Sequence, residues 1–73
     1  MPDNSYKIIE IVGVSDESIQ QAVRNAIAKA QKTIRSIQWF EVENIRGSVQ
    51  NDGKPEFQVH VRIGFRLEGA AAD

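Results

Sequence analysis

The stretch Phe57-Gln58-Val59-His60-Val61-Arg62-Ile63-Gly64-Phe65-Arg66-Leu67-Glu68 alternates between apolar and polar side chains over almost its whole length. Successive side chains of a β-strand point to opposite faces of the sheet, so this alternation predicts a strand over 55–67 with a core face and a polar face. The core face carries Phe57, Val59, Val61, Ile63, Phe65 and Leu67, and the polar face carries Gln58, His60, Arg62, Gly64 and Arg66.

A second strand is predicted over 38–49, joined to the first by the turn signal Asn51-Asp52-Gly53. Phe40 and Ile45 both have the character of inward-facing residues, yet their spacing is odd. A period of two cannot place both on one face unless one extra residue is inserted between them. We therefore expect a β-bulge near 43–44.

With this bulge, Trp39, Glu41 and Arg46 all lie on the outer, polar face of the second strand. If the turn centres near residue 52, Arg46 lies roughly opposite Gln58. The predicted hairpin thus gathers an aromatic ring, an amide and an arginine on the same face of the sheet.

The N-terminal part predicts a strand over 5–12, closed by Gly13, in which both faces are partly apolar. Ile9 and Ile11 point one way, whereas Tyr6, Ile8 and Val12 point the other. One face can cover the core of the domain. The other requires a neighbour.

A long amphipathic helix follows, for which Ser15 is the predicted N-cap, with Asp16 and Glu17 at the positive end of the helix dipole. Its apolar stripe covers about five turns. The members of the stripe are Ile19, Val23, Ala26, Ile27, Ala30, Ile34 and Ile37.

The predicted fold is therefore of the α+β class, in β-α-β-β order: a three-stranded antiparallel sheet partly wrapped around one long amphipathic helix. It forms a single domain over 1–73, ordered over about 4–68, and the tail 69–73 is expected to be mobile because nothing in it can anchor it.

Composition points to self-association. A chain of 73 residues builds only a small core, and the usual aids are missing, since it has no cysteine and a single histidine, too few ligands for a structural zinc site. Self-association is the remaining way to gain stability, so we expect a homo-oligomer. The net charge of −1 argues against a nucleic-acid partner, and no apolar run is long enough to span a membrane, so we expect a cytoplasmic protein.

The polar face suggests ligand binding more than catalysis. No cysteine nucleophile, supported serine or Gly-rich phosphate loop is present, so we expect no enzyme. Trp39 could be interface packing, the commoner case, or a stacking platform for a planar ligand. Gln58 could hydrogen-bond a pyrimidine-like ring edge. Arg46, Arg62 and Arg66 could hold a phosphate or pair with carboxylates. A functional role for the lone strand histidine, His60, is the less common case.

The sequence resembles the dodecins, small flavin-binding proteins of bacteria and archaea. The resemblance extends from about residue 5 to residue 68 without an evident insertion. It is carried by the segments Tyr6-Lys7-Ile8-Ile9-Glu10-Ile11-Val12-Gly13, Trp39-Phe40-Glu41-Val42, Ile45-Arg46-Gly47, Phe57-Gln58-Val59 and Ile63-Gly64-Phe65-Arg66-Leu67-Glu68.

This resemblance implies a homododecameric shell of cubic symmetry in which flavins bind as pairs near two-fold axes, between tryptophans of related subunits. Trp39 matches the stacking tryptophan and Gln58 the glutamine at the isoalloxazine edge. Arg46 is expected near the flavin tail, and Arg66 is expected either to contact the ligand or to form an intersubunit ion pair. FMN is the preferred ligand, with riboflavin or another flavin as alternatives, and coenzyme A is a possible second ligand.

The implied role is flavin storage with quenching of flavin photochemistry. Two alternatives stay open: a subunit of a flavin-dependent oxidoreductase that uses the same site, and a purely structural, oligomeric interaction protein in which Trp39 serves packing. The resemblance assigns no role to His60, which could add pH dependence to the site or to the assembly.

Overall fold

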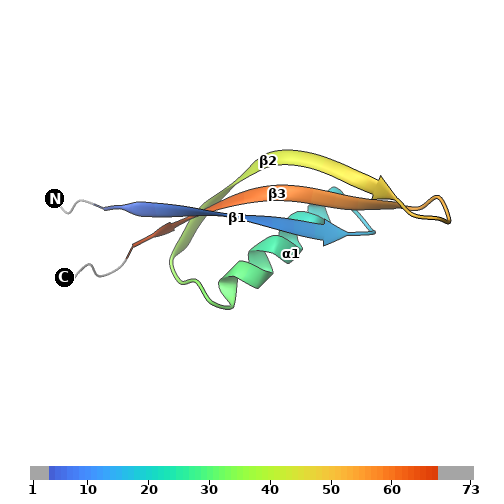
Figure 1. Ribbon diagram of the computed structural model, residues 1–73. Coiled ribbons are helices and arrows are strands. Elements are labelled where there is room, and N and C mark those ends of the chain that lie inside the picture. Colours follow the sequence, from blue (N-terminus) through green and yellow to red (C-terminus); the bar gives the residue numbers. More distant parts are fainter. Residues whose placement is uncertain (1–3, 68–73) are drawn as a thin grey trace.

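The computed structural model describes residues 4–67, which form β1 (Tyr6–Ser15), α1 (Ile19–Gln31), β2 (Ile37–Val49) and β3 (Pro55–Arg66) in that order (Figure 1). The three strands form one antiparallel sheet in the order β1-β3-β2. The predicted α+β, β-α-β-β fold is confirmed. The mobility predicted for 69–73 concerns residues outside the described range.

The core lies where α1 crosses β1 and β3. Val59, Val61 and Ile63 of the central strand are fully buried, as the alternation in β3 predicts. The helix meets them with its smallest side chains, which recur at every fourth position and let the two backbones approach closely. These side chains are Ala22, Ala26 and Ala30, whereas Ile19 of the predicted stripe is 40% exposed.

Gly13 does not close the first strand, as the sequence pattern suggested, because β1 continues to Ser15. A Cβ atom at Gly13 would lie 2.0 Å from the carbonyl oxygen of Ala22 and 3.0 Å from the Cβ of Ala26. The glycine is required because the strand passes directly against the helix backbone there, and only a residue without a side chain fits.

The predicted helix start was also wrong. The N-cap is Ser18, whose Oγ accepts a hydrogen bond of 2.9 Å from the backbone N–H of Gln21. Ser15 instead forms a turn before the helix, its Oγ accepting from the N–H of Glu17 at 2.9 Å. Asp16 and Glu17 therefore precede the helix, and its first turn contains no acidic residue. Both serines satisfy the local rule for a cap, and only one can begin the helix.

The helix ends at Gln31, earlier than the apolar stripe suggested. Ile34 and Ile37 still pack against the core, but from the connection and from β2. Ser36, just before β2, has a φ of 63°, a left-handed conformation that no α-helix continues through. Within residues 4–67, no helix has the length and hydropathy that a bilayer crossing requires.

The β-bulge predicted near 43–44 is present, since the register of β2 against β3 shifts between Val42 and Asn44. A second shift, between Ile37 and Trp39, was not predicted. The predicted register is confirmed as well: Arg46 lies opposite Gln58.

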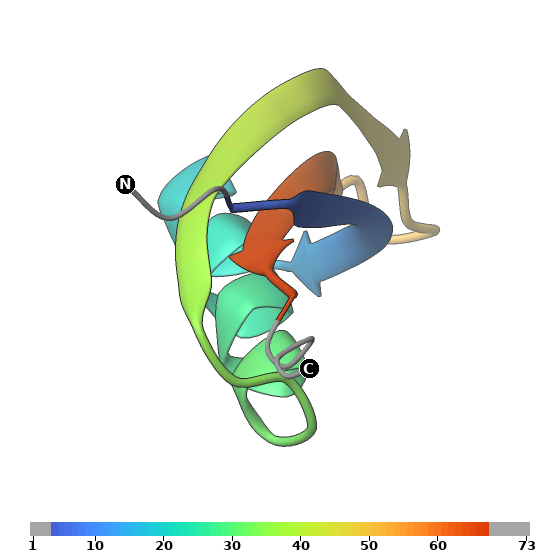
Figure 2. The same cartoon turned by 90° about the vertical axis from the view of Figure 1, so that its left-hand side faces the viewer.

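The sheet is wider than the helix that covers it. The end-on view in Figure 2 shows β2 arching beside α1. Phe40, Val42 and Ile45 share a face with the fully buried residues of β3 opposite them, yet each is 44–49% exposed. On the other face, β1 exposes a second apolar row, formed by Tyr6, Ile8, Val12 and Val14. A single chain thus leaves apolar surface uncovered on both faces of its sheet.

The contact at Gly13 yields a first prediction. Gly13→Ala should destabilise the fold by about 2 kcal/mol or more, because its methyl group meets helix backbone that cannot rotate away. Chemical unfolding followed by circular dichroism measures the loss, with Lys7→Ala, an exposed change in the same strand, as the control. Equal stability of the two variants would contradict the packing described here.

Candidate functional site

The face of the sheet opposite the helix, called the polar face here, carries the residues that the sequence predicted for ligand binding. Trp39, Glu41 and Arg46 of β2 all lie on it, as predicted. Its cross-strand rows pair Trp39 with Gly64, Glu41 with Arg62, Asn44 with His60, and Arg46 with Gln58. The first strand extends these rows with Ile8, Glu10, Val12 and Val14.

Trp39 lies over a gap in the side-chain layer. Gly64, directly opposite in β3, is buried, and a Cβ atom there would lie 2.3–2.6 Å from Cζ2, Cε2 and Cη2 of the indole. The ring of Tyr6 meets the indole edge-on, with centroids 5.3 Å apart and planes inclined by 64°. The indole is therefore seated in contact with the backbone of β3 and remains only half-buried.

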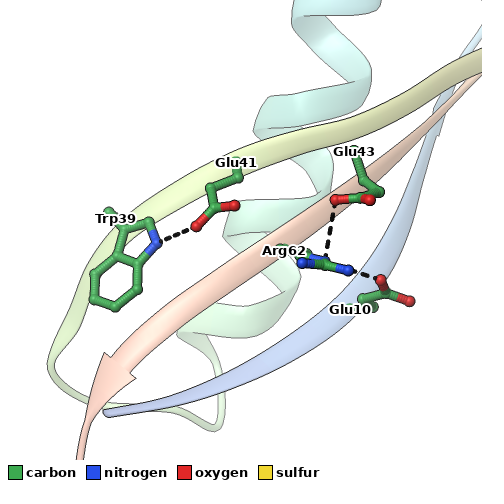
Figure 3. A network of polar contacts seen from close by, with 5 residues as sticks. All are labelled: Glu10, Trp39, Glu41, Glu43 and Arg62. Carbon is green, nitrogen blue, oxygen red and sulfur yellow. Dashed lines mark hydrogen bonds and ion pairs between the residues drawn. The ribbon is translucent and has the colours of Figure 1, made fainter. Parts of the chain in front are cut away.

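A hydrogen bond fixes the pyrrole side of the same indole. Nε1 of Trp39 donates to Oε2 of Glu41 at 2.9 Å, and Figure 3 shows the two side chains side by side along β2. Residues two apart in a strand share a face, so the sequence contained the signal for this contact. The shared face of the two residues was predicted, and the hydrogen bond between them was not.

Arg62 ties the three strands together at the centre of this face. Its Nε lies 3.2 Å from Oε2 of Glu10 in β1 and 3.1 Å from Oε1 of Glu43 in β2 (Figure 3). Glu43 reaches it from the bulge. The pKa of Arg62 is raised by its hydrogen bond with Glu10 and by the negative charge of Glu43. Of the two roles considered for this arginine, the structure shows the carboxylate pairing.

Gln58 and Arg46 form a second polar pair, farther along the hairpin. Nε of Arg46 donates to Oε1 of Gln58 at 3.0 Å, and Nε2 of Gln58 lies 3.4 Å from Oε1 of Glu56. These contacts orient the amide, with its carbonyl toward the arginine and its NH₂ group toward the carboxylate. The amide keeps a second lone pair and a second N–H for a ligand.

One chain does not bring all four predicted site residues together. Gly64, beneath Trp39, and Gln58 are six residues apart in one strand, which corresponds to about 20 Å. Arg66 is only two residues from Gly64, about 7 Å, and its cross-strand partner is Tyr6. The candidates therefore form two groups, Trp39 with Arg66 at one end of the sheet and Gln58 with Arg46 toward the other.

Between these groups lies His60, in the row of Val12 and Asn44. Its Nε2 is shielded from solvent and has no hydrogen-bond partner within residues 4–67. Most buried polar side-chain atoms in folded proteins have a hydrogen-bond partner, so this nitrogen is unusual. Its proposed pH dependence remains a prediction.

A polar depression of about 420 Å³ lies away from Trp39, beside the start of α1, and is lined in part by Ser15, Glu17, Asn25 and Glu56. Nothing in its lining corresponds to a site that the sequence predicted. In the part of the chain that the structure describes, no group of three or more histidine, aspartate or glutamate residues could hold a metal ion.

The contact between the indole of Trp39 and Gly64 yields a second prediction. Gly64→Ala should displace the indole, because the added methyl group would overlap its six-membered ring. We expect a changed near-ultraviolet circular dichroism signal, with stability lowered by about 1–3 kcal/mol. Lys54→Ala is the control, since it shortens an exposed side chain in the hairpin loop, away from Trp39. A tryptophan signal unchanged in Gly64→Ala would contradict the close contact between Gly64 and the indole of Trp39.

Comparisons with known proteins agree with this fold. Residues 5–68 match the family model described as Dodecin. A dodecin of Thermus thermophilus is 48% identical over 63 residues, which covers 86% of this chain and 91% of that protein. A calcium dodecin of Mycobacterium tuberculosis is 28% identical over 65 residues, covering 89% of this chain and 92% of that protein.

Among solved structures, the dodecin of Streptomyces coelicolor superposes with a TM-score of 0.88 at 40% identity, covering 94% of this chain and 99% of that one. The family model spans the helix and all three strands, and the relatives found by sequence and by structure are all dodecins. The chain therefore belongs to the dodecin family.

Proposed function

We propose that this protein binds and stores a flavin, with FMN as the preferred ligand, in a homododecameric assembly, and that Trp39 stacks on the isoalloxazine ring and quenches its photochemistry. The observation that carries the proposal is the seated indole of Trp39. It is held by Gly64, Tyr6 and Glu41 and remains partly exposed on the polar face. A fixed, partly exposed aromatic ring offers stacking area at little cost in side-chain entropy.

The assembly is supported by the uncovered apolar surface as well as by the family. A chain of 73 residues needs burial beyond its own small core. Phe40, Val42 and Ile45, on the helix side of β2, are apolar and about half-exposed. Contacts between copies would bury them, and a closed symmetric assembly repeats the same set of contacts in every subunit.

The separation of the two residue groups supports a site built from two subunits. In one chain, about 20 Å of strand separates the residue beneath Trp39 from Gln58, which is longer than a single isoalloxazine ring. We infer that each flavin stacks on Trp39 of one subunit and meets Gln58 of another. A two-fold axis brings these opposite ends of two sheets together, because it pairs each surface with its own copy in reverse.

The polar groups supply orientation. The amide of Gln58 both donates and accepts, which suits the pyrimidine edge of the isoalloxazine, and Arg46 holds its carbonyl in place. Arg46 and Arg66 are exposed cations that could receive the phosphate of FMN. Coenzyme A is retained as a second candidate ligand on the family resemblance alone.

Storage is preferred over turnover. Stacking and quenching need ring contact with an electron-rich indole and no acid or base. A flavin-dependent oxidoreductase would have to admit a second substrate beside the stacked ring. A structural role without ligand is the other alternative, and a cytoplasmic location remains a prediction from the sequence.

The third prediction tests the ligand. Flavin-stripped protein titrated into FMN should quench the flavin fluorescence strongly and saturate at about one flavin per subunit, because each two-fold pair offers two equivalent sites. Trp39→Ala should lower the affinity by at least tenfold, since stacking of a large ring contributes more than 1 kcal/mol, while the assembly stays intact by light scattering.

Trp39→Phe serves as the matched variant, because it keeps an aromatic platform with a poorer electron donor. It should retain more of the affinity than of the quenching. FMN fluorescence that stays constant throughout the titration of the unaltered protein would favour the structural alternative.

The fourth prediction tests the two-subunit site. Trp39→Ala and Gln58→Ala subunits, unfolded together and reassembled as a mixture, should regain tight binding at about a quarter of the sites, because half of the two-fold pairs are mixed and each of those restores one complete site. Each variant reassembled alone is the control. If both residues act on one flavin from the same chain, mixing restores nothing.

A further inference from the structure

We propose that Glu41 is a positioning residue for Trp39, whose carboxylate fixes the orientation of the indole and keeps it electron-rich as a partner for the flavin. The proposal rests on the flavin-binding function proposed above. It starts from the hydrogen bond between Nε1 of Trp39 and Oε2 of Glu41, at 2.9 Å.

The three contacts of the indole act on different parts of it. Gly64 leaves room for the six-membered ring, and Tyr6 meets the ring system edge-on. Neither contact is directional enough to decide which edge of the indole faces along β2. The N–H group has one donor direction, and Glu41 occupies it. Of the three contacts, only the one with Glu41 therefore selects a single orientation of the ring.

The ion pairs of Arg62 go to other carboxylates, although the nearby charge of Glu41 also contributes to raising the pKa of Arg62. Arg62 lies directly opposite Glu41 and would be its natural partner across the strands. Its Nε, however, is directed at Glu10 and Glu43, at 3.2 and 3.1 Å (Figure 3). Glu43, at the bulge, pairs with Arg62 in place of Glu41. Glu41 therefore keeps its hydrogen bond with Trp39.

A carboxylate is a stronger acceptor for the indole N–H than a neutral group. It draws the proton of Nε1 toward itself and leaves the ring richer in electrons. On illumination, one electron passes from the indole to the excited flavin and then returns, so no bond changes and no net oxidation occurs. During that interval the negative charge of Glu41 stabilises the positively charged indole. Quenching should accordingly depend on the charge of Glu41 as well as on its hydrogen bond.

Two variants separate orientation from charge. Glu41→Gln keeps an oxygen that can accept the hydrogen bond but removes the charge, whereas Glu41→Ala removes both. Glu17→Gln is the charge control, because it neutralises an exposed carboxylate just before α1, outside the network of Arg62 and Trp39. Trp39 is the single tryptophan of the chain, so the near-ultraviolet circular dichroism and anisotropy of tryptophan report on it alone, even without flavin.

In the flavin-free protein, Glu41→Ala should lose most of the near-ultraviolet tryptophan signal and lower the anisotropy, whereas Glu41→Gln should keep both. With FMN bound, Glu41→Gln should bind within about twofold of the unaltered protein but lengthen the excited-state lifetime of the flavin severalfold. Glu41→Ala should also weaken binding by about tenfold, the loss expected for one charge-assisted hydrogen bond. Glu17→Gln should change none of these quantities.

A tryptophan signal and a flavin lifetime that stay unchanged in Glu41→Ala would overturn the proposal. If Glu41→Ala does not assemble, Glu41→Gln decides, since an unchanged lifetime there excludes the role of the charge. Should the unaltered protein fail to bind FMN, the proposed function falls, and the flavin-free tryptophan signal of Glu41→Ala still decides whether Glu41 orients the indole.

Discussion

The pairing of β3 with both of its neighbours is the interaction on which the rest of this structure depends. The strand is hydrogen-bonded along both edges, and its alternating side chains point to two different faces of the sheet. Val59, Val61 and Ile63 hold the helix on one side. Gly64 and Gln58 support the candidate flavin site on the other. A shift of register by one residue would exchange these faces and abolish core and site together.

The sequence alone could predict what depends on side-chain period. The alternation of β3, the bulge in β2 and the pairing of Arg46 with Gln58 follow from spacing and turn chemistry. The features that could not be predicted depend on distances between backbones. Gly13 has the character of a strand terminator until the helix is known to lie against it, and Ser15 satisfies the rule for an N-cap as well as Ser18 does.

For the candidate site, too, part could be predicted from the sequence and part could not. Pattern alone placed Trp39, Arg46, Gln58 and Arg66 on one face, but only the three-dimensional register separates them into two groups about 20 Å apart. Association with a second copy of the chain would account for both observations. It can complete the site and bury the apolar surface that one chain leaves uncovered. Glu41 and Gly64, which hold the indole in place, could have been found from their period in the strands.

A crystal structure of the FMN-loaded assembly would show directly whether a flavin stacks on Trp39 at a site shared by two subunits. We expect an isoalloxazine ring against the indole of one subunit, with its pyrimidine edge at the Gln58 amide of a neighbour related by a two-fold axis. A ring bound elsewhere, or one that meets Trp39 and Gln58 of the same chain, would rule out the shared site.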